Sequence, residues 1–138
     1  MMNMQSANAY KAQQIMTASP EQLTLMLYNG AIRFVGEAIM AIDEGELEKS
    51  HNANMRAQDI VREFMCTLKM DMEVSQGFYA LYDYLEFRLI QGNLKKDKSM
   101  LQEARDMLID MRDTWGEAMK RAKAEQGPAP VQTAASYR

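Results

Sequence analysis

Residues 19–43 read SPEQLTLMLYNGAIRFVGEAIMAID, and this stretch predicts a long helix that is apolar over most of its circumference. Ser19 stands at the N-cap, Pro20 at the first helical position and Gln22 at the third, which is the arrangement of a capping box. Gly45 follows the stretch and can supply a turn. Because only a narrow polar wedge interrupts the apolar surface, we expect this helix to be central in a bundle or covered on two sides.

Three more helices are predicted downstream, over residues 46–68, 75–92 and 97–123. Prolines are absent from these ranges, β-branched residues are sparse, and apolar residues recur at steps of three and four. The residues expected to face the core are Ala53, Ala57, Ile60, Val61, Phe64 and Leu68 in the first; Phe78, Leu81, Tyr82, Leu85 and Leu89 in the second; and Leu101, Ala104, Leu108, Met111, Trp115, Ala118 and Ala122 in the third.

The boundaries of these helices follow from local signals. Ser75 is a candidate N-cap, the Gly92-Asn93 pair is a candidate left-handed stop, and Asp97 can open the last helix. Long helices joined by short connections pack as antiparallel neighbours. The predicted fold is therefore all-α, an antiparallel four-helix bundle with an N-terminal arm. We divide the chain into an arm at residues 1–18, a bundle domain at 19–124 and a flexible C-terminal tail at 125–138.

The composition limits the classes of partner and compartment. The 138 residues carry 16 basic and 19 acidic side chains, so no basic excess exists to displace counterions from nucleic acid. Cys66 is the single cysteine, which excludes an intrachain disulfide and fits a reducing compartment. We recognise no targeting peptide and no apolar run of the length that a membrane span needs. A cytoplasmic protein without stable membrane insertion or nucleic-acid binding is expected.

The sequence offers no recognisable catalytic, cofactor-binding or metal-binding residues. His51 is the single histidine, so the paired Glu-x-x-His motifs of a di-metal bundle are absent. Cys66 lies fifteen residues from His51 on one predicted helix, about 22 Å away by the helical rise. A non-covalent haem held by His51 and a methionine is the alternative left open, although the polar surroundings of His51 favour a solvated position. We predict that the chain is not an enzyme and needs no cofactor.

Methionines and aromatic residues instead favour a binding module. The chain has 14 methionines, whose flexible side chains suit variable apolar partners. Five aromatic residues fall within residues 78–87 and cannot all face one core line. Tyr79 and Phe87 are therefore candidates for an exposed apolar groove, the usual receiver of an amphipathic helix. The alternative is a structural or regulatory module in which both helix faces are buried, inside the bundle or in a homodimer.

Residues 10–31, YKAQQIMTASPEQLTLMLYNGA, closely resemble the N-terminal signature of the flagellin-specific export chaperones, the FliS family. The resemblance continues through AQDIV at 57–61, LYDYL at 81–85 and RDTW at 112–115, so that it extends over residues 10–120. The first block is highly specific, whereas the shorter ones would each be weak in isolation. The additional methionines at the start and the Gly-Pro-Ala tail depart from the family pattern.

The resemblance implies a cytoplasmic four-helix bundle that binds the disordered C-terminal segment of flagellin. Such a chaperone prevents premature polymerisation and assists delivery to a component of the flagellar export gate. The resemblance also implies that the N-terminal arm can cover part of the binding surface, so Tyr10 and Ile15 are expected in a lid or in a docking element for the export machinery. The residues that we expect to form the binding groove are Ile60, Val61, Phe64, Leu68, Phe78, Tyr79, Tyr82 and Leu85.

Several of these residues have a second expected role. Ile60, Phe64 and Leu85, together with Leu81, are also expected to hold the bundle together. We assign Leu108, Met111 and Trp115 to the core.

Overall fold

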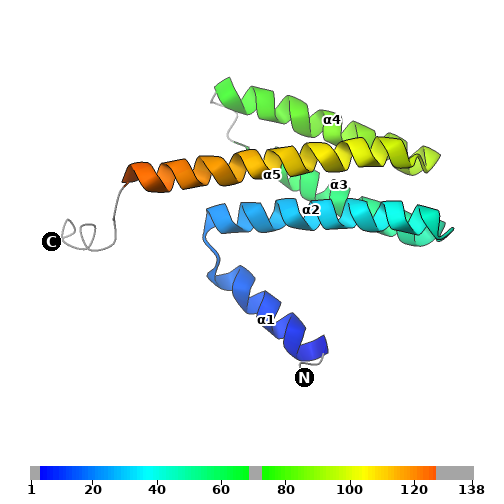
Figure 1. Ribbon diagram of the computed structural model, residues 1–138, viewed down its shortest axis with the longest axis horizontal. Coiled ribbons are helices and arrows are strands. Elements are labelled where there is room, and N and C mark those ends of the chain that lie inside the picture. The colour runs from blue at the N-terminus through cyan, green and yellow to red at the C-terminus, as the bar shows by residue number, and fades with distance from the viewer. Residues whose placement is uncertain (1–3, 69–72, 127–138) are drawn as a thin grey trace.

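The computed structural model describes residues 4–68 and 73–126, and its elements confirm the predicted all-α class. In chain order these are α1 (Met4–Thr17), α2 (Pro20–Asp43), α3 (Leu47–Thr67), α4 (Glu73–Lys95) and α5 (Lys98–Gln126). The predicted tail beyond Gln126 lies outside the described residues, as does the connection at 69–72. α2 to α5 lie side by side, whereas α1 projects away from the start of α2 (Figure 1).

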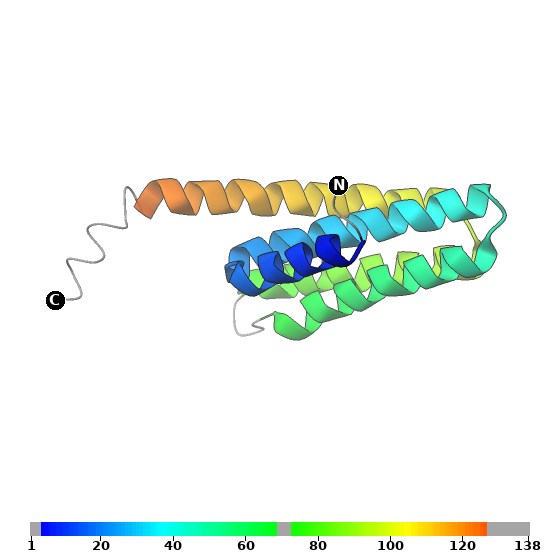
Figure 2. The same ribbon diagram turned by 90° about the horizontal axis from the view of Figure 1, so that it is seen from below.

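The four long helices each pack against two neighbours. α2 contacts α3 and α5, and α4 contacts the same two helices from the opposite corner. α2 and α4 run from left to right in Figure 1, and α3 and α5 run in the reverse direction. Short turns join α2 to α3 and α4 to α5 at one end of the molecule, and α5 extends beyond the other helices at the opposite end (Figure 2).

The start of α2 has the predicted capping box. The Gln22 amide donates to Ser19 Oγ over 3.2 Å, and the Ser19 amide donates to Gln22 Oε1 over 2.9 Å. Pro20 occupies the first turn, where its missing N–H costs nothing. The helix ends at Asp43 as predicted, and Gly45 adopts a φ of 76° in the following turn. Local chemistry therefore sets both ends of α2.

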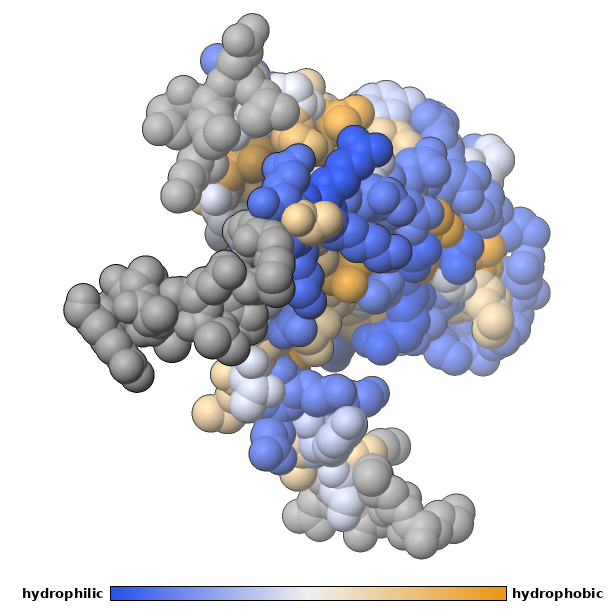
Figure 3. Space-filling view, turned by 60° about the vertical axis from the view of Figure 1, so that its left-hand side comes forward, coloured by the Kyte–Doolittle hydropathy of each residue, from blue (hydrophilic) through white to orange (hydrophobic). Residues whose placement is uncertain are grey.

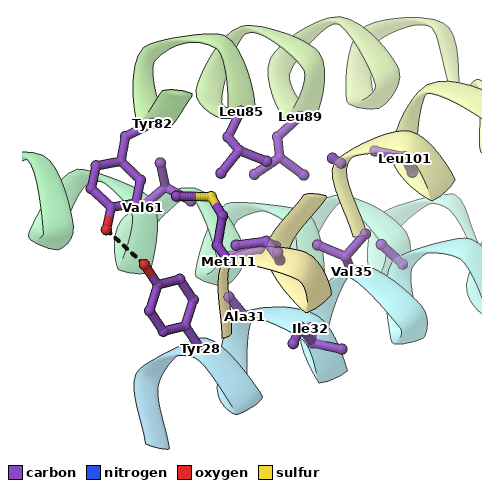
Figure 4. Packing of buried hydrophobic residues seen from close by; sticks show 14 of the residues in the cluster. Tyr28, Ala31, Ile32, Val35, Val61, Tyr82, Leu85, Leu89, Leu101 and Met111 are labelled. Atoms are coloured by element: carbon purple, nitrogen blue, oxygen red, sulfur yellow. Dashed lines mark hydrogen bonds between the residues drawn. The ribbon is translucent and has the colours of Figure 1, made fainter. Parts of the chain in front are cut away.

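The core lies between the facing stripes of α2 to α5. Val35, Leu85, Leu89, Leu101 and Leu108 have no exposed surface, and Figure 4 shows side chains of all four helices converging on this layer. The predicted stripe residues Ala53, Ala57 and Val61 of α3, Leu85 and Leu89 of α4, and Leu101, Ala104 and Leu108 of α5 are confirmed as buried. The buried residues of α2 are Tyr28, Ala31, Ile32, Val35, Ala38 and Ala41.

A row of buried polar side chains on α3 joins it to its two neighbours. Ser50 Oγ donates to the Ala38 carbonyl of α2 over 2.9 Å. Asn54 Nδ2 donates to the Leu89 carbonyl of α4 over 3.2 Å, and Gln58 Nε2 donates to Asn54 Oδ1 over 2.7 Å. These bonds satisfy polar atoms that would be costly to bury alone. The apolar pattern of α3 did not predict this row.

Two predicted boundaries of α4 are wrong. Ser75 is buried inside the helix, which begins at Glu73, and therefore does not cap it. α4 also continues past Gly92, and the residue with positive φ is Lys96, at 49°. A Cβ on Gly92 would lie 2.6 Å from Leu101 Cδ2, so this glycine permits close packing of α4 against α5 instead of ending a helix.

The start of α5 follows the prediction. Asp97 Oδ1 accepts the Ser99 amide at 2.9 Å and the Met100 amide at 3.3 Å, which satisfies two free donors of the first turn. The Ser99 hydroxyl also donates to Asp97 Oδ1 over 2.9 Å, and this bond, together with the two amide bonds, holds the pKa of the Asp97 carboxyl below its ordinary value.

The stripes predicted for α4 and α5 include residues that are not buried in the core. Leu81, expected on the core side of α4, is exposed. Ala118 and Ala122 in the last third of α5 are exposed as well, because α5 extends beyond its neighbours there. Leu108 and Met111 are buried as predicted, whereas Trp115 is partly buried and packs against the edge of the core.

One helix of the described residues, α2, is long and apolar enough to cross a membrane by length and composition alone. We had expected no such segment from the sequence. The criterion does not distinguish a span from a core helix, and six residues of α2 belong to the core described above.

Candidate functional site

A cavity of about 370 Å³ opens at the end of the molecule opposite the two short turns. All four packed helices contribute to its wall, at the start of α2 and α4 and toward the end of α3 and α5. Figure 3 brings this end forward and shows hydrophobic surface between the polar side chains. The lining residues are Thr24, Tyr28, Phe64, Thr67, Leu68, Ser75, Phe78, Tyr82, Met111, Thr114, Trp115 and Ala118.

Stacked aromatic rings form one side of the cavity. The Phe64 ring centroid lies 4.6 Å from that of Tyr28 and 5.2 Å from that of Tyr82. Phe78 continues the row, with its centroid 6.4 Å from that of Tyr82. Rings at these separations attract one another beyond the effect of burial alone. The row connects α2, α3 and α4, so it gives the cavity a wall that does not depend on a single helix.

The two tyrosine hydroxyls at the inner end of this row bond to each other. Tyr28 Oη and Tyr82 Oη are 2.7 Å apart, and both residues are buried (Figure 4). Burial raises the pKa of both phenols, and the bond to Tyr82 raises the pKa of Tyr28 further. Both hydroxyls are therefore neutral at physiological pH and already have a partner, so this wall presents a mainly apolar surface.

Trp115 forms the opposite wall, from α5. Its Nε1 donates to the Glu21 carbonyl in the first turn of α2 over 3.3 Å. This bond orients the indole and satisfies its single hydrogen-bond donor, while the partly buried ring packs against the core. Small side chains such as Thr24, Thr114 and Ala118 border the cavity nearby and leave its mouth open.

No acidic, basic, imidazole or thiol group belongs to the lining that the structure describes. Nor do residues 4–68 and 73–126 contain three or more His, Cys, Asp or Glu side chains that could hold a metal ion together. His51 lies at the other end of the molecule, where its Nδ1 is 2.9 Å from Asn93 Nδ2. The lining suits the binding of apolar side chains.

The structure brings together four of the ten residues predicted for the groove and its lid. Phe64, Leu68, Phe78 and Tyr82 line the cavity, and Phe64 also belongs to the core as expected. The remaining six lie elsewhere. They are Val61 and Leu85, which have no exposed surface; Ile60, which packs partly buried beside α2; Tyr79, which is 40% exposed on the outer side of α4; and Tyr10 and Ile15, which are exposed on α1.

Six cavity residues lie on helices that the predicted groove did not include, and three of them have large side chains. Tyr28 comes from α2, and Met111 and Trp115 come from α5. Tyr28 precedes Ala31, Ile32 and Val35 at helical spacing, and that spacing is the signal that could have placed it on the buried face. Nothing in the sequence of α5 distinguishes a core residue from one at the open end.

Comparison with known proteins places the chain in a family. Residues 1–122 match the family model described as "Flagellar protein FliS". A flagellar secretion chaperone FliS of Bacillus subtilis is 37% identical over 118 residues, which cover 86% of this chain and 89% of that protein. A flagellar secretion chaperone FliS of Salmonella typhimurium is 26% identical over 115 residues, which cover 81% of this chain and 85% of that protein. A third, of Campylobacter jejuni, is 29% identical over 119 residues.

The family model covers α1 to α4 and α5 as far as residue 122, and the named relatives are flagellar secretion chaperones. The chain belongs to the FliS family of flagellar secretion chaperones.

Proposed function

We propose that this protein is a cytoplasmic chaperone that binds the disordered C-terminal segment of flagellin, prevents its premature polymerisation and assists its export. Membership of the FliS family and the apolar cavity at the open end of the helices support this proposal. In this proposal, each of the three segments of the chain has its own role. An antiparallel four-helix bundle over residues 19–124 holds the client, residues 1–18 form an arm, and 125–138 form a tail.

The cavity is the observation that carries the proposal. Terminal segments of a filament subunit must pair with other subunits, so the free monomer exposes apolar side chains. A chaperone that buries such side chains competes with polymerisation by mass action, which needs neither ATP nor a covalent step. Each large apolar side chain removed from water contributes about 1.5–3 kcal/mol before the cost of ordering the segment. That ordering costs about 2–5 kcal/mol, which keeps release to the export gate feasible.

The arm is the second part of the proposal. α1 makes no extensive contact with α2 to α5, and it exposes Tyr10, Ile15 and Met16. We assign Tyr10 and Ile15 to a lid that covers the cavity before the client arrives, or to a docking element for the export gate. Deletion of residues 1–16 separates these roles. A lid predicts tighter binding of a flagellin C-terminal peptide by the shortened chain, whereas unchanged or weaker binding contradicts the lid.

Co-purification tests the client itself. The chain is expected to retain full-length flagellin from the same organism and to lose flagellin that lacks its C-terminal segment. Equal recovery of both forms would contradict the proposal. Sedimentation of the free chain tests the alternative hypothesis of a structural or regulatory module. A tight homodimer that covers the cavity would favour that alternative.

A substitution at the mouth of the cavity tests the binding place. Ala118 is exposed and borders the cavity, so Ala118→Phe is expected to fill the mouth and to weaken peptide binding at least tenfold. Ala124 is exposed further along α5 and does not line the cavity, which makes Ala124→Phe the matched control. Equal affinity of the two variants would show that the peptide binds elsewhere.

A further inference from the structure

A second groove lies between α2 and α5, apart from the apolar cavity. It encloses about 490 Å³ and shares no lining residue with the cavity. Gln102 and Arg105 form its α5 side, and its α2 side consists of Arg33, Gly36, Glu37, Ile39, Met40 and Asp43. Met40 is 61% exposed, so this groove combines an uncovered apolar side chain with a guanidinium group.

Arg105 has no acidic partner in this groove. Among the described residues it makes no ion pair or hydrogen bond, and its Nε is shielded from solvent without an acceptor. The other polar groups that line the groove are paired. Arg33 lies 3.8 Å from Glu37, Asp43 pairs with Lys98, and Gln102 bonds to Asp106 over 3.0 Å. Arg105 is therefore the one charged side chain of the described lining that has no ion-pair partner.

Gly36 allows the guanidinium to lie close to α2. A Cβ at this position would be 3.4 Å from Arg105 Nε, at the near limit of ordinary contact. A glycine in the middle of a helix costs about 1 kcal/mol of stability relative to alanine. Here the glycine leaves room in which Arg105 and a ligand group can both be accommodated.

We propose that the α2–α5 groove binds a helical stretch of the client in which an Asp or Glu side chain lies one turn from a large apolar residue. The carboxylate would give the Arg105 guanidinium the acceptor that it lacks, and the apolar residue would pack on Met40, one turn along α2 from Gly36. Charge-assisted hydrogen bonds of this kind are strong when they are shielded from water. This inference rests on the proposed function, because it assigns a second contact to the same flagellin segment.

A double-mutant cycle tests the inference. The C-terminal segment of flagellin from the same organism is titrated into the chain, and into Arg105→Gln, with each Asp or Glu of the segment changed in turn to Asn or Gln. We expect Arg105→Gln to weaken binding of the unmodified segment about tenfold, and to have little further effect once one particular carboxylate has been removed. Arg88 already pairs with Glu103, so Arg88→Gln is the control that should couple to no carboxylate.

The outcomes separate this inference from the proposed function. Failure of the unaltered chain to bind the segment contradicts both. Binding that Arg105→Gln leaves unchanged, or that couples to no carboxylate, contradicts the inference alone.

Glycine substitutions provide a second measurement that does not remove a charge. Gly36→Ala is expected to raise the melting temperature slightly and yet to weaken segment binding several-fold, because the methyl group would take up space beside Arg105 Nε that the carboxylate of the segment needs. A Cβ on Gly116 of α5 would have no neighbour within 4 Å, so Gly116→Ala should stabilise the chain without affecting binding. Equal affinities of the two variants would overturn the assigned role of Gly36.

Discussion

The two ends of the helical assembly differ in how completely they are packed. At the end with the short turns, Gly92 brings α4 against Leu101, and His51, Asn93 and Lys96 are linked by hydrogen bonds. At the opposite end, aromatic rings and small residues surround a cavity of about 370 Å³. Well-packed interiors contain few voids of this size, so the open end forgoes contacts that the closed end makes. The difference teaches that close packing and an open apolar surface can occupy opposite ends of one short helical assembly.

The largest expected effect on the free energy of unfolding comes from truncating a core side chain. Truncation of a cavity side chain serves as the comparison. Leu89→Ala should lower the free energy of unfolding by about 2–5 kcal/mol, because Leu89 is fully buried. Phe78→Ala should cost much less stability, since Phe78 is partly exposed at the cavity, but should weaken peptide binding about tenfold or more. Urea unfolding and peptide titration of both variants measure this. Similar losses of stability in the two variants would remove the distinction between the ends.

The next effect concerns two glycines of α4. Gly92→Ala places a methyl group 2.6 Å from Leu101 Cδ2 and should destabilise the protein by about 1–3 kcal/mol. A Cβ on Gly77 would have no neighbour within 4 Å, so Gly77→Ala should stabilise the protein by about 0.5–1 kcal/mol. Thermal unfolding checks the opposite signs. Stabilisation by both substitutions would mean that α4 and α5 are not tightly packed at the closed end.

A smaller effect is expected from the tyrosine pair of the open end. The folded-state pKa values of Tyr28 and Tyr82 are raised above the unfolded value of about 10. Their contribution to stability is therefore complete below pH 10 and is lost as the pH rises above 10. Changing both residues to Phe should flatten the fall in unfolding free energy between pH 9 and 11, as measured by urea unfolding at each pH. A slope identical to that of the unaltered chain would contradict this.

The smallest effect is expected at the exposed pair Lys98–Asp43, which joins α5 to α2 at the closed end. Both side chains are about half exposed, and such pairs contribute roughly 0–1 kcal/mol. Lys98→Ala should change the urea midpoint only slightly, and less in high salt than in low salt. A loss as large as that of Gly92→Ala would show that surface charge, and not close packing, maintains the closed end.

Local signals were the part of the fold that the sequence predicted best. The Ser19 cap, the Gly45 turn and the Asp97 helix start depend on residues within a few positions of one another, and all three are confirmed. The core stripe in the first half of α5 was also predictable, because helical periodicity determines which face is apolar. Gly92 was misread because its neighbour Leu101 belongs to another helix.

The candidate site was predicted only in part, for a related reason. Periodicity placed Phe64, Phe78 and Tyr82 on inward faces, and these residues do meet at the cavity. It could not show that Val61 and Leu85, on the same faces, lie deeper in the core. Nor could it show that Tyr28 and Trp115, which are far apart in the sequence, complete the wall. How deep a residue lies along the long axis of the molecule depends on the alignment of all four helices. The sequence of a single helix does not determine this alignment.

The capping box at Ser19 has a consequence for how the first segment can move. α2 satisfies its leading amides within residues 19–22, and Pro20 cannot donate a hydrogen bond to a preceding helical turn. α1 and α2 are therefore separate helices, and the cap of α2 does not involve α1. A change in the direction of α1 at residues 18–19 would leave the first turn of α2 intact.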